Sequence, residues 1–95
     1  MEVHLDGRLI RTERDFHEQL AQKLDLGPYY GCNLHALWDS LSRDVEGPCK
    51  IIWHNAEESR KNLGKTFEMI IDVFDRVVQE DQELGEPGPF AYGLE

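Results

Sequence analysis

The sequence contains no apolar run that approaches the roughly 18 to 20 residues of a membrane-spanning helix. Its start, MEVHLDGRLIRTERDF, also lacks the basic, apolar and small-residue segments of a secretory signal. These absences predict a protein without a membrane partner that works in the cytoplasm. Only two cysteines occur, Cys32 and Cys49, and in that compartment we expect free thiols. A disulfide between them is the less favoured alternative.

Basic residues are few, since 10 lysines and arginines stand against 19 acids and give a formal net charge of −9. They are also scattered among acids, whereas binding to nucleic-acid phosphates needs a basic stripe. We therefore expect no direct contact with nucleic acid. The acidic balance either serves solubility alone or indicates a cationic partner. At 95 residues, we expect a single domain over 1–95.

The first 27 residues predict one strand and one helix. Val3 and Leu5 alternate with polar neighbours before the Asp-Gly pair at 6–7, which indicates a strand and a turn or, alternatively, a hairpin tip. Thr12 and Asp15 have the spacing of a capping box, and an apolar stripe at helical spacing follows them. The stripe consists of Phe16, Leu20, Ala21 and Leu24.

A second helix is predicted from Asn33, a good N-cap residue, to about Arg43. Its core face consists of Leu34, Leu37, Trp38 and Leu41, which fall at i, i+3, i+4 and i+7. We expect Trp38 to be mainly a core residue with one edge reaching the surface.

The second half of the sequence predicts a strand, two helices and a last segment that allows two interpretations. CKIIWH at 49–54 is typical of a central strand covered on both faces, with Trp53 in the core. Asn55 with Glu58 predicts the cap of a short helix, and a long helix should run from about 66 to 82. Residues 85–95 form either a weak last strand or a loose tail. Strands separated by helices indicate an α/β protein with a small parallel sheet.

One helical stripe carries candidate chemistry. His35, Asp39 and Ser42 lie at i, i+4 and i+7, away from the core face, so they should face solvent or a partner. Catalysis would also need a nucleophile or a defined pocket, and the sequence shows neither, so we expect no catalytic residue. An enzyme using Cys32 with His35 is the minor alternative. The same two residues have ligand-like spacing but no complete zinc pattern, so we expect no metal and no cofactor.

The segment LDLGPYYGCNLHALWDSLSRDVEGP resembles the barstar family of intracellular ribonuclease inhibitors, whose motif is close to YYGxNLDALWDxL followed by an acidic loop. The resemblance continues in LDGRLIRTERDFHEQLAQKLDL and IIDVFDRVVQE, and it covers roughly residues 3 to 80. It implies a three-stranded parallel sheet flanked by helices. It also implies a protein that plugs the active site of a secreted, cationic ribonuclease as a monomer in a 1:1 complex.

The resemblance implies that the second helix and the loop before it form the inhibitory surface, with the carboxylate of Asp39 in the place of an RNA phosphate. Tyr29 would cover the mouth of the nuclease site, although the sequence alone leaves open whether Tyr29 or Tyr30 is an anchor or both are structural. The implied surface further includes Asn33, Leu34, His35, Trp38, Ser42, Arg43, Asp44, Glu46, Arg76 and Glu80.

Two of these residues depart from the family pattern. His35 stands where the family usually has an aspartate, and Arg76 stands where an acid is common. The alternative function is therefore an immunity-type or regulatory interaction module of the same fold, directed at a protein that is not a ribonuclease.

Overall fold

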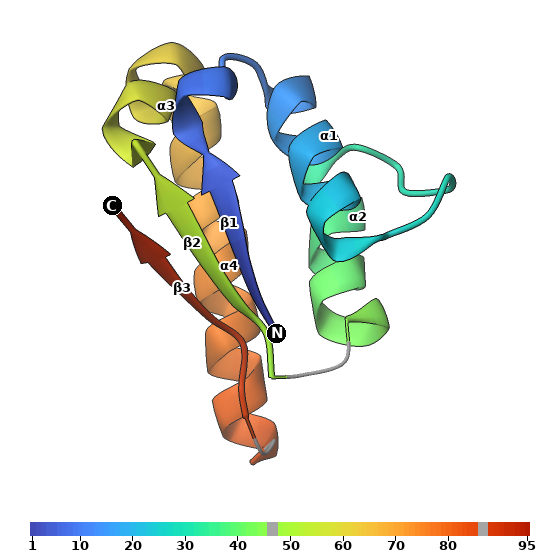
Figure 1. Cartoon of the computed structure of the whole chain (residues 1–95). Coiled ribbons are helices and arrows are strands. Elements are labelled where there is room, and N and C mark those ends of the chain that lie inside the picture. The colour runs from blue at the N-terminus through green and yellow to red at the C-terminus, as the bar shows by residue number, and fades with distance from the viewer. Residues whose placement is uncertain (46–47, 86–87) are drawn as a thin grey trace.

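Strands and helices alternate along the chain, as the apolar spacing predicts (Figure 1). The computed structural model describes residues 1–45, 48–85 and 88–95. The elements are β1 (Glu2–Asp6), the 3₁₀ turn η1 (Gly7–Leu9), α1 (Glu13–Leu24), α2 (Leu34–Asp39), the π-helical turn η2 (Ser40–Asp44), β2 (Lys50–His54), α3 (Ala56–Leu63), α4 (Lys65–Leu84) and β3 (Ala91–Leu94).

The three strands form one parallel sheet in the order β1-β2-β3. Val3 lies opposite Ile51, and Ile51 lies opposite Tyr92. Each parallel connection needs a crossover, and α1 with α2 provides the first while α3 with α4 provides the second. The predicted α/β fold with a small three-stranded parallel sheet flanked by helices is confirmed, and β1 continues into a turn rather than a hairpin.

Helix ends follow the sequence signals at most positions. The Thr12 hydroxyl accepts a hydrogen bond from the Asp15 amide and the Asp15 carboxylate accepts one from the Thr12 amide, so the predicted capping box is confirmed. The prediction for Asn55 is wrong, because its backbone is left-handed at φ 54° and its side chain makes no capping hydrogen bond. Its carbonyl instead accepts from the Glu58 amide at 3.1 Å.

The helices cover one face of the sheet. Val3, Leu5, Ile51 and Trp53 point to that face and are buried, whereas Glu2 and His4 on the other face of β1 are exposed. Figure 1 shows α4 behind the sheet with α1 and α2 to one side of it. The prediction that the central strand is covered on both faces is therefore wrong. The apolar run of β2 is unbroken because Ile52, which points to the open face, is also apolar. Neighbouring side chains on that face leave it only 6% exposed.

Aromatic side chains fill the space between the sheet and the helices. Trp53 is fully buried, and its ring lies 5.1 Å from the rings of both Phe16 and Phe67. Phe74 on α4 contacts Trp53 on one side and Tyr92 of β3 on the other. The Tyr92 hydroxyl donates to the Asp75 carboxylate, and burial together with this bond raises the pKa of Tyr92 to about 12. This cluster joins α1, the sheet and α4 into one core.

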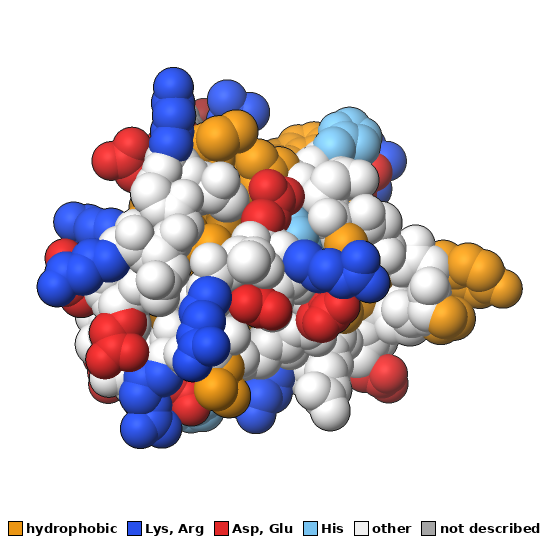
Figure 2. Space-filling model, turned by 90° about the horizontal axis from the view of Figure 1, so that it is seen from above, with side chains coloured by type: hydrophobic (Ala, Val, Ile, Leu, Met, Phe, Trp, Pro, Cys, Tyr) orange, Lys and Arg blue, Asp and Glu red, His pale blue; other side chains and the backbone are white. Residues whose placement is uncertain are grey.

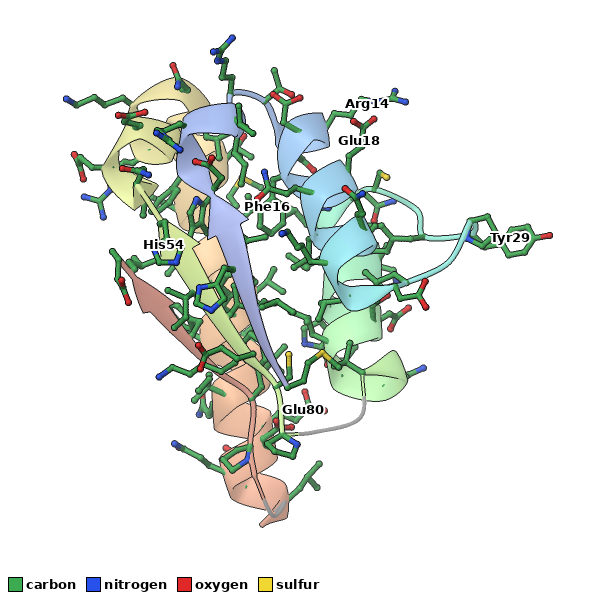
Figure 3. The ribbon with its side chains drawn as sticks, viewed as in Figure 1. Arg14, Phe16, Glu18, Tyr29, His54 and Glu80 are labelled. Carbon is green, nitrogen blue, oxygen red and sulfur yellow. The ribbon has the colours of Figure 1, made fainter. Side chains whose placement is uncertain are left out.

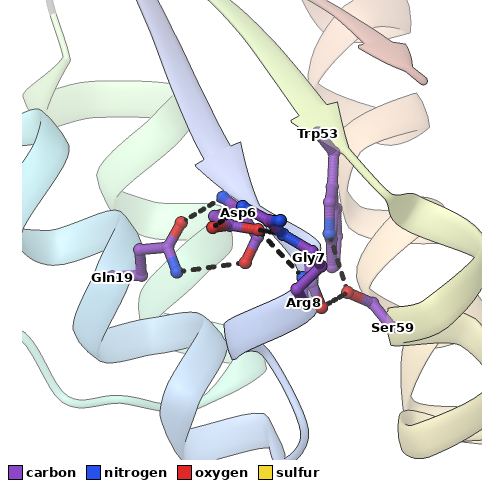
Figure 4. A network of polar contacts seen from close by, with 6 residues as sticks. All are labelled: Asp6, Gly7, Arg8, Gln19, Trp53 and Ser59. Carbon is purple, nitrogen blue, oxygen red and sulfur yellow. Dashed lines mark hydrogen bonds and ion pairs between the residues drawn. The ribbon is translucent and has the colours of Figure 1, made fainter.

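A polar network closes the core where β1 and β2 end (Figure 4). The buried hydroxyl of Ser59 on α3 donates to the Gly7 carbonyl at 2.8 Å and accepts from the Trp53 indole at 3.0 Å. Gln19 on α1 accepts from the Asp6 amide and lies 3.4 Å from the Asp6 carbonyl, so its amide group pairs with β1 as a neighbouring strand would. The network ties β1, β2, α1 and α3 together.

Ser59→Ala should destabilise the fold, because it leaves the buried Trp53 indole N–H without a partner and removes one of the two hydrogen bonds of the Gly7 carbonyl, which also accepts from the Ile10 amide. We expect a cost of about 1 to 3 kcal/mol for the unsatisfied indole. Asn62→Ala, at an exposed position of the same helix, should change the free energy of unfolding by less than about 0.5 kcal/mol. Urea unfolding of both variants checks this, and equal effects would contradict the role given to Ser59.

Candidate functional site

The loop between α1 and α2 projects one tyrosine into solvent. α1 ends at Leu24, the next residue, Asp25, adopts a left-handed conformation at φ 53°, and the chain then turns outward. The Tyr29 side chain is 96% exposed and points away from the body of the molecule (Figure 3). A large aromatic side chain that is exposed to water contributes nothing to the stability of the fold. Tyr29 is therefore available as a contact residue.

The neighbouring tyrosine belongs to the scaffold. Tyr30 is half-buried, and its hydroxyl lies 2.7 Å from Nδ1 of the fully buried His17. The other nitrogen of His17 lies 3.0 Å from the Glu13 carboxylate, so the chain of contacts reaches the first turn of α1. Burial raises the pKa of the Tyr30 hydroxyl, which keeps it protonated. Tyr30 thus fixes the loop that presents Tyr29.

The loop joins α2 through a side-chain cap. The Asn33 side-chain oxygen accepts from the Ala36 amide at 2.8 Å, and its NH₂ group donates to the Gly31 carbonyl at 3.2 Å. The predicted N-cap is confirmed. Cys32, just before it, is exposed and left-handed at φ 51°, while Cys49 is buried, and both are free thiols. Burial raises the pKa of the Cys49 thiol.

α2 presents a carboxylate beside an imidazole. Nε2 of His35 lies 3.6 Å from the Asp39 carboxylate, one helical turn away. The His35 side chain is 84% exposed and that of Asp39 is 41% exposed, so both can reach a partner. As predicted from their spacing, the two residues lie together off the core face, because Leu37 on the opposite side is fully buried.

The stripe does not continue to Ser42. The turn widens at η2, where the Val45 amide donates to the Ser40 carbonyl five residues back. The wider turn rotates Ser42 inward, and its hydroxyl is buried with no hydrogen-bond partner among residues 1–45, 48–85 and 88–95. The expectation that Ser42 faces solvent with His35 and Asp39 is wrong. Arg43 is exposed, whereas Glu46 and the Asp44 side chain lie outside the described part of the chain.

α2 packs against α4, and a groove of about 460 Å³ lies between them. It brings together four of the residues singled out in the sequence, namely Leu34, His35, Trp38 and Arg76, with Met69, Asp72 and Val73. Its wall is mainly apolar. Trp38 is half-buried against the core and also lines the groove, which fits its two predicted roles.

On the α4 side of this groove, sequence reasoning named Arg76 but missed Met69, Asp72 and Val73. Met69, Asp72, Val73 and Arg76 fall at i, i+3, i+4 and i+7, which is the spacing of one helix face. This stripe runs beside the core stripe, and exposed Met69 on it was the available signal. Glu80 follows Arg76 by one turn, is half-buried, and lies outside the groove lining (Figure 3).

A metal site, a nucleic-acid-binding surface and a membrane-spanning helix each find little support in the described residues. The described residues contain no group of three or more His, Cys, Asp or Glu that could hold a metal ion. Figure 2 shows the end of the molecule formed by η1, α3 and the start of α1, where acidic and basic side chains are interspersed without a continuous basic stripe. Among the helices described, none combines the length and apolar character that crossing a bilayer requires.

Comparison with known proteins adds two matches. A family model described as "Barstar (barnase inhibitor)" matches residues 1–93 of this chain. A curated Bacillus subtilis (strain 168) protein, named "Putative ribonuclease inhibitor YrdF", is 37% identical over 81 residues, which cover 85% of each chain. Both matches extend over the surface formed by the Tyr29 loop, α2 and α4.

The two tyrosines should differ in their effect on stability. Tyr30→Phe removes the hydroxyl that contacts buried His17, so we expect a loss of about 1 to 3 kcal/mol in the free energy of unfolding. Tyr29→Phe removes the same hydroxyl from an exposed ring and should cost less than about 0.5 kcal/mol. Chemical denaturation measures both. A larger loss for Tyr29→Phe would show that the loop is held in another way.

Proposed function

This chain belongs to the barstar family of ribonuclease inhibitors, and we propose that it blocks the active site of a cationic, secreted microbial ribonuclease. The resemblance carried by residues 24–48 and extending over roughly residues 3 to 80 is confirmed by the family match. In this proposal the protein acts as an inhibitor in the cytoplasm, as a monomer in a 1:1 complex and without a cofactor. It inhibits the nuclease before the nuclease leaves the cell.

The observation that carries the proposal is the Asp39 carboxylate on the exposed side of α2. A ribonuclease site gathers cationic groups around the RNA phosphate, and a carboxylate can accept the same charge-assisted hydrogen bonds. The net charge of −9 supports the proposal further, because it attracts a basic partner from a distance. Asp39 is therefore the central anion of the proposed complex.

Tyr29 is the proposed aromatic anchor beside this anion. A rigid ring that is already exposed loses little conformational freedom on binding and offers a large contact area. Asn33, Leu34 and Trp38 would contribute the rim, and His35 lies next to the anion. Arg43, Asp44, Glu46, Arg76 and Glu80 extend the proposed contact. Tyr30 holds the loop that presents Tyr29, and the buried hydroxyl of Ser42 lies outside the proposed contact.

A second candidate function is an immunity-type or regulatory module directed at a protein that is not a ribonuclease. The observation in its favour is that His35 and Arg76 bring a titratable and a positive group to one groove. Titrating the purified protein into activity assays of several small basic ribonucleases separates the two. Stoichiometric inhibition of one of them supports the proposal, and inhibition of none favours the second candidate.

Asp39→Ala should weaken inhibition strongly, because it strands desolvated cationic groups of the nuclease without a partner. Truncating one member of a buried, hydrogen-bonded charge pair costs about 2 to 5 kcal/mol, and the barnase–barstar complex itself provides larger values. Glu57→Ala makes the same charge change at an exposed, remote position and should cost no more than about 1 kcal/mol.

The measurement is the inhibition constant of each variant together with its thermal midpoint. Asp39 lies off the core face, so the midpoint of Asp39→Ala should stay close to that of the unaltered protein. Unchanged inhibition of a nuclease that the unaltered protein blocks would refute the role of Asp39 as phosphate mimic.

Inhibition should also weaken as pH falls through the range in which histidines titrate, between pH 8 and 5. A protonated His35 would partly cancel the Asp39 carboxylate 3.6 Å away, so the dissociation constant should rise at low pH. We expect about a two- to five-fold rise, the size typical of an exposed charge pair. In His35→Gln this part of the pH dependence should vanish, and an identical profile in both proteins would mean that position 35 does not face the partner.

A further inference from the structure

The open face of the sheet carries two histidines that meet through their nitrogens. Nδ1 of His4 on β1 lies 2.8 Å from Nε2 of His54 on β2. The ring planes differ by 11° and the ring centres are 5.0 Å apart, much farther than the two nitrogens. The rings are therefore arranged edge to edge, as in an N–H···N hydrogen bond, and not face to face.

A carboxylate follows at each end of this pair. The second nitrogen of His4, Nε2, lies 3.0 Å from a Glu2 carboxylate oxygen. The second nitrogen of His54, Nδ1, lies 3.6 Å from a Glu95 carboxylate oxygen. Glu2, His4, His54 and Glu95 thus form a row across the sheet, and we call these four residues the histidine row. His54 is labelled on β2 in Figure 3.

Counting protons shows that this row is incomplete when both histidines are neutral. Each of its three contacts needs one N–H, because ionised carboxylates only accept. Two neutral imidazoles supply two N–H groups, so one contact must lack a proton. The His4–His54 contact at 2.8 Å is a hydrogen bond and the His4–Glu2 contact at 3.0 Å is at ion-pair distance, whereas the 3.6 Å contact of His54 with Glu95 is too long for a hydrogen bond. One additional proton, on Nδ1 of His54, would complete the row.

We propose that the histidine row is a proton-operated clasp, in which uptake of one proton by His4 and His54 fastens the end of β3 to the sheet. The proton leaves solvent and adds to Nδ1 of His54, and the resulting N–H donates to the Glu95 carboxylate. No covalent bond changes other than this N–H. A second additional proton would place N–H against N–H between the rings and break the contact of His4 with His54.

Glu95 is placed to transmit this proton uptake to the backbone. Its amide donates to the Trp53 carbonyl at 2.9 Å, and its carbonyl accepts from the Ala56 amide at 3.0 Å. β3 is an edge strand of four residues, so its end has few other restraints. Drawing the Glu95 side chain toward His54 would hold both backbone hydrogen bonds closed.

Acidic groups outnumber basic groups on the elements around the pair. Those that face the pair or line the hollows beside it are Glu2 and Asp6 on β1, Arg8 on η1, Asp15, Glu18 and Lys23 on α1, Lys50 on β2, and Glu95. Arg8 is engaged by the Asp6 carboxylate, and its hydrogen bonds lower the pKa of Asp6. The carboxylates at the two ends of the row touch the imidazoles directly.

The geometry argues for a proton and against a metal ion. The nitrogens of His4 and His54 point at each other along a line, and their outer nitrogens point in opposite directions to different carboxylates. Metal ligands must instead converge on one point. The described residues contain no group of three or more His, Cys, Asp or Glu arranged in that way.

Amide hydrogen exchange, followed by NMR on the complete chain, tests the clasp without any partner. Between pH 8 and pH 6 the protection factor of the Glu95 amide should rise about two- to five-fold, as expected for an exposed charge-assisted contact. The Ala91 amide, which donates to the Cys49 carbonyl at the other end of β3, serves as the control and should change less. In His54→Gln and in Glu95→Gln the rise at residue 95 should disappear.

The imidazole ¹⁵N signals provide a second measurement. His4 and His54 should titrate as a coupled pair, so that His54→Gln changes the titration of His4. Independent titration of the two rings, or an unchanged rise in Glu95 protection in both variants, overturns the proposal. Binding of Zn²⁺ or Ni²⁺ that shifts both rings at micromolar concentration and pH 7 also overturns it, because the pair would then be a metal site.

Discussion

The buried hydroxyl of Ser59 makes the two hydrogen bonds on which the arrangement of the elements depends. It joins the Gly7 carbonyl at the end of β1 to the Trp53 indole on β2, and it does so from α3. Gly7 has no side chain, and an added Cβ would collide with the carbonyl oxygens of His54 and Asn55. The two parallel strands can therefore end side by side only with glycine at position 7. This fixes where α1 starts and how Trp53 enters the core.

The short helix α2 and the loop before it, which form the proposed binding surface, are held in place by the core beneath them. α2 has only six residues, and so short a helix is unstable on its own. Leu37 and Leu41 anchor it in the core, while the contact of Tyr30 with His17 holds the loop before it. Tyr29 and the Asp39 carboxylate can thus remain exposed in a fixed relation. The contacts that position them are made by their buried neighbours.

The sequence by itself determined the periodic elements and their order. Apolar residues at helical spacing located α1, α2 and α4, and the Thr12 and Asn33 caps located two helix starts, because these signals act over three to eight neighbouring residues. Strands separated by helices were enough to predict a parallel sheet. The motif at 24–48 resembles the barstar family, and the family match confirms that resemblance.

Only the tertiary structure decided which distant residues meet. The groove combines α2 with α4, and His4 meets His54 across 50 positions of sequence, so neither follows from local spacing. The π turn at η2 moved Ser42 off its predicted face, and the left-handed backbone of Asn55 removed its cap. Both deviations arise where the chain must join packed elements. Packing of the whole core sets the backbone there, and the preference of a single residue is too weak to resist it.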